Sequence, residues 1–392
     1  MIPFPALLEA RLADLQERSQ YRELRPRGGL DFTSNDYLGF AEDPVLTERF
    51  RASLDGLPLG ASGSRLLRGE LPLHQAIEAE LATFVGREAA VLFPSGYQAN
   101  VGLLTSVLRP GDLVFSDELN HASIIDGIRL SKATRAVYPH GDLETLRRLL
   151  QRQPASPGLK VIVTESLFSM EGDLAPLVEL AGVAATFEAI LIVDEAHATG
   201  LYGGQSGAGV VSELGLGRQV FATVHTGGKA LGAAGAWVAG DHRLKDYLVN
   251  CSRPLIFSTA PAPATAVALQ LAVNRWRETG ALRARGVFER TAHLLHRLTP
   301  VAAAHGIGLP AVPGPIVPVI LGGNARALAV ARELQGAGFD VRAIRPPTVP
   351  SGTARLRITV TWPRSMDEID RLAVALANSL DRSKVPEAGV KA

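Results

Sequence analysis

The stretch AILIVDEAHATG, residues 189–200, decides the fold, because a short apolar run ends there abruptly in charged and polar side chains. An apolar run of this length is typical of a strand that is buried on both faces of a parallel sheet. The Asp-Glu-Ala-His at 194–197 is also the box of one class of nucleic-acid helicases, in which the acidic pair holds magnesium. An Asp and a His three residues apart at a strand end suit an aromatic cofactor equally well. The rest of the chain has to distinguish these two interpretations.

Similar short, β-rich runs recur along the central part of the chain: AAVLF (89–93), DLVFSD (112–117), KVIVTE (160–165), VFATVHT (220–226) and AGAWVAG (234–240). Helical patterns such as LHQAIEAELATFVG (73–86) and DLETLRRLLQRQ (142–153) lie between most of them. This alternation predicts an α/β fold with a mostly parallel sheet, covered by helices on both faces. Ligands of such sheets bind beyond the carboxyl ends of the strands.

The pattern changes after about residue 285. PIVPVIL (315–321), FDVRAIRPP (339–347) and RLRITVTW (355–362) predict strands of a second, smaller sheet. The Ser-Met-Asp-Glu at 365–368 is a capping box, and it predicts a last helix with Ile369, Leu372 and Leu376 on its buried face. We therefore expect a large domain over 46–284 and a small α+β domain over 285–384. An N-terminal segment, 1–45, should pack with the small domain, and 385–392 should be a flexible tail.

The composition argues against nucleic acid and membrane partners. Forty basic and 39 acidic side chains leave a net charge of +1, so no overall field attracts a polyanion. Cys251 is the only cysteine, which excludes an intramolecular disulfide. Pro3, Pro5 and nearby charges make the N-terminus unlike a signal peptide. We expect a soluble, cytoplasmic protein.

Three alternative chemistries fail on the residues themselves. A helicase needs G-x-x-x-x-G-K-[ST] before its acidic box, but the only Gly-Lys pair, Gly228-Lys229, follows the box and precedes Ala230. No H-E-x-x-H is present, and the nine histidines are scattered, so a zinc site is not indicated. The hydrolase elbow G-x-S-x-G is nearly matched at 204–208, but Ala208 replaces its last glycine.

Pyridoxal phosphate (PLP) fits the same sequence better. The cofactor needs a lysine for its aldehyde, a carboxylate for its ring nitrogen, a flat side chain for its ring face and a helix N-terminus for its phosphate. Lys229 lies in the small-residue loop HTGGKALGAAGA, and Asp194 ends a buried strand, where an unpaired carboxylate would be costly. His197 would then point to the ring hydroxyl. Alone, each has an ordinary alternative, a surface lysine or a turn-capping Asp with an incidental His.

The remaining requirements also have candidates that follow predicted strands. Gly96 and Tyr97 open a helix after AAVLF and would offer backbone N–H groups to a phosphate, to which Thr226 adds a hydroxyl. His121 could lie over the ring, and Ser169 could donate to the ring hydroxyl. Taken singly, each is more often a local cap or loop residue. The prediction rests on their joint occurrence at one edge of one sheet.

These motifs resemble those of the α-oxoamine synthases, PLP enzymes of the aspartate aminotransferase fold (fold type I). The resemblance covers nearly the whole chain, through FTSNDYLGF, GASGSR, SGYQAN, NHAS, TESLFSMEGD, VDEAHATG, HTGGKALG and STAPAP, and its most discriminating stretch is IRPPTVPSGTARLRITV at 344–360. It implies a seven-stranded, mostly parallel sheet in the large domain. It also implies a homodimer with its active site at the subunit interface.

By position, the resemblance implies roles for the candidates. Catalytic roles fall on Lys229 (Schiff base), Asp194 (ring nitrogen), His197 (ring hydroxyl) and His121 (stacking and proton transfer). Cofactor contacts fall on Gly96, Tyr97, Ser169, Thr226 and, from the other subunit, Thr259. Arg357 would hold the amino-acid carboxylate with Asn35 close by, and Arg18 would lie near the acyl substrate. No metal is expected.

The resemblance implies decarboxylative condensation of an amino acid with an acyl thioester. The sequence of residues 344–360 most resembles that of family members acting in biotin biosynthesis. This resemblance favours L-alanine with a pimeloyl thioester of coenzyme A or of an acyl carrier protein. Family members that use glycine with acetyl groups, form 5-aminolevulinate, or join serine to palmitate are the alternatives. Three departures stand out: the Arg18–Asn35 stretch is short, Gly227 replaces a bulkier residue, and Glu195 stands where Asp also occurs. The short stretch weakens the Arg18 assignment.

Overall fold

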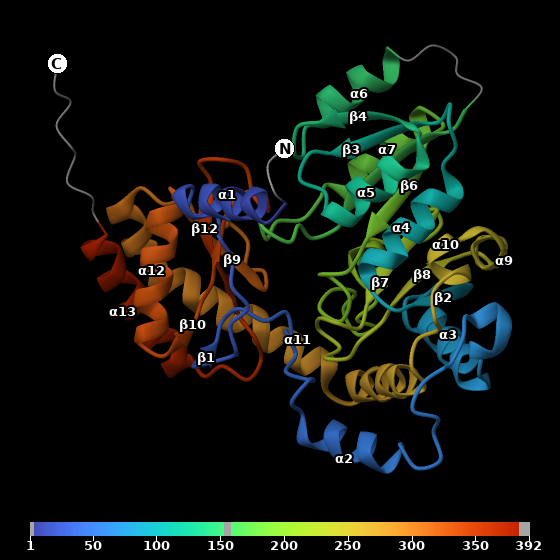
Figure 1. The fold of residues 1–392 in the computed structure, drawn as a ribbon, viewed down its shortest axis with the longest axis horizontal. Helices are drawn as coiled ribbons and strands as arrows, with labels where there is room; N and C mark the ends of the chain where they lie inside the picture. Colours follow the sequence, from blue (N-terminus) through green and yellow to red (C-terminus); the bar gives the residue numbers. More distant parts are fainter. Residues whose placement is uncertain (1–3, 153–157, 384–392) are drawn as a thin grey trace. The chain divides into compact units, whose positions relative to one another are not determined.

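The computed structural model describes residues 4–152 and 158–383 and divides the chain into two compact units (Figure 1). The large unit comprises residues 35–169 and 173–285. The small unit comprises the described residues before 35, the triplet 170–172 and the described residues from 286 onward. The divisions therefore fall at 34/35 and 285/286, where the sequence predicted 45/46 and 284/285, and the central triplet was not foreseen. The predicted tail, 385–392, lies outside the described residues.

The large unit is built on a seven-stranded sheet, which confirms the predicted fold class. Its strands lie in the order β2 (Ala89–Phe93), β8 (Ala236–Gly240), β7 (Ala222–Thr226), β6 (Ile190–Asp194), β5 (Lys160–Glu165), β3 (Leu113–Asp117) and β4 (Thr134–Tyr138). Strand β8 is antiparallel to both of its neighbours, and every other pair is parallel. Sequence patterning missed β4, because it is an edge strand whose first two residues, Thr134 and Arg135, are exposed.

Helices complete the large unit on both sides of the sheet (Figure 1). The helices of the large unit are α2 (Pro44–Ala52), the π-helix η1 (Arg65–Gly69), α3 (Pro72–Phe84), α4 (Gly96–Val107), α5 (Ala122–Ser131), α6 (Leu143–Gln151), α7 (Leu177–Thr186), α8 (Val210–Glu213), α9 (His242–Cys251) and α10 (Arg253–Ile256), and α2 lies apart from the sheet. One buried cluster joins Leu103 of α4 and Ile124 of α5 to Val163 and Val224 of the sheet. This packing fixes the N-termini of α4 and α5, where three candidate site residues lie: Gly96, Tyr97 and His121.

The small unit contains two small sheets. An antiparallel sheet has the order β11 (Ala343–Ile344), β12 (Ala354–Thr359), β9 (Ile316–Gly322), and a parallel pair joins β1 (Leu30–Asp31) to β10 (Phe339–Asp340). The predicted single strand 339–347 is wrong, because the chain leaves one sheet after β10 and enters the other at β11. Around the sheets lie α1 (Phe4–Glu17), α12 (Asn324–Gly336), α13 (Met366–Arg382) and the last part of α11 (Pro263–His305).

Two further expectations were tested here. The capping box of α13 is confirmed: Ser365 Oγ accepts from the Glu368 N–H at 3.2 Å, and Glu368 Oε2 accepts from the Ser365 N–H at 2.8 Å. Ile369, Leu372 and Leu376 are buried, as the periodicity predicted. Among the described residues, no helix combines the length and the apolar character needed to cross a membrane.

Candidate active site

Strand direction brings the candidate residues to one edge of the large sheet. Strands β2, β3, β5, β6 and β7 all run the same way, since β2 and β7 are each antiparallel to β8. Five candidates end these strands or follow them: Gly96, His121, Ser169, Asp194 and Thr226. The carboxyl edge of the sheet therefore collects the groups that the sequence had assigned to a ligand.

Asp194, the last residue of β6, is a buried carboxylate with both oxygens oriented. Its Oδ1 accepts from the Ala196 N–H at 2.8 Å, and its Oδ2 accepts from Asn100 Nδ2 at 2.6 Å. Hydrogen bonds to a carboxylate partly offset the cost of its burial and restrict its rotation. Asp194 is thus held as a fixed acceptor at the end of the strand.

Asn100 connects Asp194 to His121, and sequence reasoning missed it. Besides Asp194, the buried Asn100 amide donates to Ser123 Oγ at 2.9 Å. Ser123 Oγ lies 2.7 Å from His121 Nδ1, which also accepts from the Ser123 N–H at 3.3 Å. Because Nδ1 accepts, the imidazole proton lies on Nε2. Asn100 closes the quoted motif SGYQAN and Ser123 closes NHAS, so the signal was present but unassigned.

The pKa of His121 is lowered, first by burial. The negative charge of Asp194 raises it and the positive charge of Lys229 lowers it. A neutral imidazole results, which suits stacking on a ring. Asp194 and Lys229 thus have opposite effects on the pKa of this histidine.

His197 is buried and is fixed by Tyr37, a second residue that the sequence reasoning missed. The Tyr37 hydroxyl lies 2.6 Å from His197 Nδ1 and donates to Asn35 Oδ1 at 3.2 Å. Since a hydroxyl has a single proton, both bonds are satisfied when His197 Nδ1 carries a proton and donates it to the tyrosine oxygen. Asn35, predicted near the amino acid, therefore also belongs to the support of His197.

The start of α4 lies beside Thr226, the last residue of β7. A β-carbon built at Gly96 would meet only the Thr226 Cβ, at 3.9 Å, so the helix N-terminus is open there. Ser95 caps the helix by accepting from the Gln98 N–H at 3.3 Å. Thr226 Oγ1 donates to Gly235 O at 3.0 Å and accepts from the Gly228 N–H at 3.1 Å. An open helix N-terminus beside a hydroxyl has the groups that bind an anion in other proteins.

Two of the residues predicted to contact the cofactor are exposed. Tyr97, in the first turn of α4, keeps 46% of its surface exposed and donates its hydroxyl to Asp126 Oδ2 at 2.5 Å. That bond is the main reason why the pKa of Tyr97 is raised. Thr259 is exposed. Ser169, in the loop after β5, is by contrast buried.

Lys229 lies in a tight, glycine-rich turn after β7. The turn closes with the Gly232 N–H on the Lys229 carbonyl at 2.9 Å. Gly232 has φ +61°, and a β-carbon there would lie 2.2 Å from the Ala41 nitrogen. Gly227 stands where a bulkier residue was expected from the resemblance. A β-carbon at 227 would lie 2.3 Å from Leu269 Cδ2 of α11. Leu269 occupies the space that a side chain at 227 would need.

Glu195, the second acid of the DEAH sequence, has a structural role. Its Oε2 accepts from Ser166 Oγ at 2.6 Å and from the Val210 N–H at 3.1 Å, and its Oε1 accepts from the Val211 N–H at 2.6 Å. Full burial raises the pKa of Glu195 to about 7, although these bonds oppose the rise. The carboxyl group ties the end of β6 to the start of α8, and no group of metal-binding side chains occurs in the described parts of the chain.

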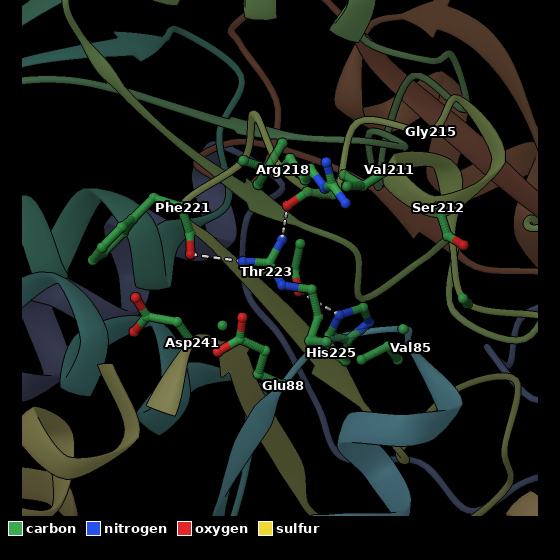
Figure 2. Close-up of a pocket in the computed structure, with 16 residues that line it drawn as sticks. Val85, Glu88, Val211, Ser212, Gly215, Arg218, Phe221, Thr223, His225 and Asp241 are labelled. Atoms are coloured by element: carbon green, nitrogen blue, oxygen red, sulfur yellow. Dashed lines mark hydrogen bonds between the residues drawn. The ribbon is translucent and has the colours of Figure 1, made fainter. Parts of the chain in front are cut away.

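A cavity of about 790 Å³ lies at another part of the large unit, apart from the predicted site residues (Figure 2). Its walls include Phe221, Thr223 and Asp241, at the start of β7 and the end of the antiparallel β8, and therefore at the amino edge of the parallel strands. His225, also in its wall, bonds Thr199 and Thr223 at 2.8 Å each. Burial lowers the pKa of His225 to about 3. None of the predicted site residues lines this cavity.

Arg18 and Arg357 belong to the small unit. Arg357, on β12, is buried and donates to Thr359 Oγ1 at 3.0 Å. Arg18 is exposed and pairs with Asp14 at 2.7 Å, while its carbonyl accepts from Asn324 Nδ2 at 3.0 Å. Within the small unit, therefore, a buried arginine and an exposed one stand where the sequence predicted substrate contacts.

The large-unit residues fit a flat aromatic cofactor with an anionic group. They provide a fixed carboxylate, two oriented imidazoles, a lysine and an open helix N-terminus. Glu195 directs its oxygens at Ser166 and α8, and the described residues hold no group of three or more acidic, histidine or cysteine side chains suited to a metal ion. The donor set is therefore that of PLP rather than that of a nucleotide-bound metal.

Comparison with known proteins gives consistent results. A family model described as aminotransferase class I and II matches residues 27–376. The 8-amino-7-oxononanoate synthase of Methylococcus capsulatus is 43% identical over 385 residues, which cover 94% of this chain and 97% of that protein.

Solved structures agree with the fold. The serine palmitoyltransferase of Sphingomonas wittichii superposes with a TM-score of 0.87 at 28% identity and covers 98% of each chain. A structure of SPT with PLP as internal aldimine superposes with a TM-score of 0.86 at 27% identity and covers 97% of this chain and 98% of that one. The sequence comparison thus gives an 8-amino-7-oxononanoate synthase, and the structural comparison gives serine palmitoyltransferases.

Proposed function

We propose, from the premise that the chain belongs to the aminotransferase class I and II family, that it is a PLP-dependent 8-amino-7-oxononanoate synthase. It would condense L-alanine with a pimeloyl thioester and release carbon dioxide and the thiol carrier. The observation that carries this proposal is 43% identity over 94% of the chain to a protein of that name. The second candidate, a serine palmitoyltransferase-type reaction, is favoured only by the fold superposition at 28% identity.

The residues of the carboxyl edge have defined tasks in this proposal. When bound, PLP supplies an electron sink for the carbanion at the amino-acid Cα. Lys229 supplies the amine that holds the cofactor aldehyde and that removes the Cα proton of alanine. Asp194, oriented by Asn100 and by the Ala196 N–H, holds a proton on the ring nitrogen. Arg357, a residue of the small unit, is assigned by the resemblance to the alanine carboxylate, which later leaves as carbon dioxide.

The other residues position the cofactor. His197, fixed by Tyr37, bonds the ring hydroxyl, and Ser169 donates to the same oxygen. His121 packs on the ring face. The phosphate is bound by the N–H groups of Gly96 and Tyr97 and by Thr226. For the last contact, the Thr226 hydroxyl must exchange its bond to Gly235 O for one to the phosphate. Asn35 near the carboxylate and Arg18 near the acyl chain complete the assignment.

The first experiment is the visible absorption spectrum of the purified protein with PLP, titrated with L-alanine, glycine and L-serine and then with pimeloyl thioester. We expect a band of protein-bound PLP that L-alanine perturbs at the lowest concentration, followed by release of carbon dioxide when the thioester is added. Absence of a bound-PLP band would refute the cofactor. A preference for serine would move the chain to the second candidate.

Two variants test the assignments within the site. Lys229→Ala should bind PLP without a borohydride-reducible bond and should lose turnover. Asp194→Asn should retain the fold but slow Cα-proton exchange of alanine by orders of magnitude, because the ring nitrogen loses its charged partner. Normal exchange in Asp194→Asn would remove that residue from the mechanism.

We also propose a cytoplasmic homodimer in which Thr259 of one protomer contacts the phosphate bound by the other, as the exposed position of Thr259 allows. Mixed dimers of Lys229→Ala and Thr259→Ala protomers should then regain one intact site. If mixing restored neither activity nor tight PLP binding, Thr259 would act within its own protomer.

A further inference from the structure

A groove of about 430 Å³ in the small unit, here named the arginine groove, has an unusual concentration of positive charge. It is lined from the segment after α1, from α12 and from the β10–β11 region, and its charged or aromatic lining residues include Arg22, Arg25, Arg332, Arg342, Arg345 and Tyr21. Glu23 is the only acid in its lining. Five arginines against one acid stand out in a chain whose net charge is +1. Such a surface concentrates anions.

Three of the five guanidinium groups have no acidic partner among the described residues. Arg25 pairs with Glu23 at 2.7 Å, and Arg342 pairs with Asp340. Arg22 donates instead to the Pro346 carbonyl at 3.2 Å, and no ion pair forms at Arg332 or Arg345 within 4–152 and 158–383. The groove therefore keeps an uncompensated positive charge.

Arg345, which also lines the groove, is held by the chain segment after α1. It is buried, and its guanidinium donates to the carbonyls of Ser19 and Tyr21, the latter at 3.2 Å. Burial lowers the pKa of Arg345, and the charges of Arg22 and Arg332 lower it further. The three cations thus repel one another, and a bound anion would relieve that repulsion.

We propose that the arginine groove binds the phosphate-bearing nucleotide end of coenzyme A, so that the acyl donor of the proposed reaction, on which this inference rests, is the coenzyme A thioester. Guanidinium forks match phosphate oxygens in a bidentate manner. The volume lies within the range of small-molecule sites, roughly 300–1,000 Å³. Tyr21, 38% exposed in the lining, offers a flat face to the adenine ring.

The test compares Arg22→Gln/Arg332→Gln with a control, Arg371→Gln, an exposed arginine of α13 outside the groove lining. Calorimetric titration of the PLP-loaded enzyme with free coenzyme A should show roughly tenfold weaker binding for each arginine removed, about a hundredfold in all. Binding of pantetheine, which lacks the phosphates, should be unchanged, and the control should bind coenzyme A normally. Unchanged coenzyme A affinity in the double variant would overturn the proposal.

Kinetics separate binding from structural damage. The double variant should raise KM for pimeloyl-coenzyme A with kcat unchanged, and should not alter turnover of the pimeloyl N-acetylcysteamine thioester, which has no nucleotide. Equal losses with both thioesters would mean structural damage and would refute the assignment. A loss confined to a pimeloyl carrier protein would make the groove a protein-docking surface, which also refutes it. The calorimetric titration needs no turnover. It therefore tests binding of coenzyme A to the arginine groove even if the protein does not catalyse the proposed reaction.

Discussion

Replacement of Asn100 by Ala tests whether the network behind the cofactor edge sets both stability and chemistry. The substitution removes a buried amide that donates to Asp194 Oδ2 at 2.6 Å and to Ser123 Oγ at 2.9 Å. A hydrogen bond to a charged group contributes about 2 kcal/mol and a neutral one about 1 kcal/mol, so the free energy of unfolding should fall by about 3 kcal/mol. Urea denaturation of the PLP-free protein measures this directly. Turnover should also fall, by roughly 10- to 100-fold, because the carboxylate is no longer fixed.

Two serines provide matched controls for Asn100→Ala. Ser123→Ala removes only the neutral bond to Asn100 together with the contact to His121, so it should cost less stability than Asn100→Ala. Ser106 lies on α4, the helix that also carries Asn100. Ser106→Ala removes only the hydrogen bond to the Gly102 carbonyl and should leave turnover unchanged. A loss below about 1 kcal/mol in Asn100→Ala, with normal turnover, would show that Asp194 is oriented without Asn100.

Three further variants test single contacts. Tyr37→Phe removes the hydroxyl bonded to His197 Nδ1 and should lower turnover roughly tenfold at an unchanged far-ultraviolet circular dichroism spectrum; full activity would contradict the role of Tyr37. His140, bonded to two aspartates, has its pKa raised to about 10, mainly by these partners against the opposing effect of burial. The stabilisation by protonated His140 is therefore complete below pH 6.5 and is lost as the pH rises toward 10. Between pH 6.5 and 10, the free energy of unfolding should fall less for His140→Gln than for the unmodified protein. Parallel curves of unfolding free energy against pH would contradict this role of His140. Gly209 has φ +105°, and Gly209→Ala places a β-carbon 2.7 Å from a Glu195 oxygen. The substitution should therefore lower the free energy of unfolding by about 3 kcal/mol in a denaturation experiment. A loss under about 1 kcal/mol would mean that the Glu195 carboxylate moves freely.

The sheet was predictable because its strands are short apolar runs that end in turns. The predicted runs at 89–93 and 160–165 match β2 and β5 residue for residue. The edge strand β4 was not predicted, since a strand with exposed residues lacks the apolar signal. The run at 339–347 was misread because a sequence pattern does not show that two halves of one run pair with different partners.

The candidate site was predictable only where a residue type has its own chemistry. Lysine, histidine and a buried Asp attract attention at a strand end, whereas Asn100 and Tyr37 do not. Their partners lie 94 and 160 residues away along the chain. Such pairings depend on how helices and loops pack on the sheet, so no local pattern can indicate them.

The DEAH sequence shows how one short motif is divided between two tasks by geometry. Asp194 ends β6 and Glu195 directly follows the strand, and the two side chains have different partners. Asp194 is held by Asn100, from the helix that packs on one face, while Glu195 accepts the N–H groups at the start of α8. The acid that a metal-binding interpretation needs as a second ligand is therefore consumed as a cap. Full burial raises the pKa of Glu195 to about 7 against the hydrogen bonds that it accepts. Asp194, held by Asn100 at the end of β6, is therefore the acid of this pair that we assign to a ring nitrogen.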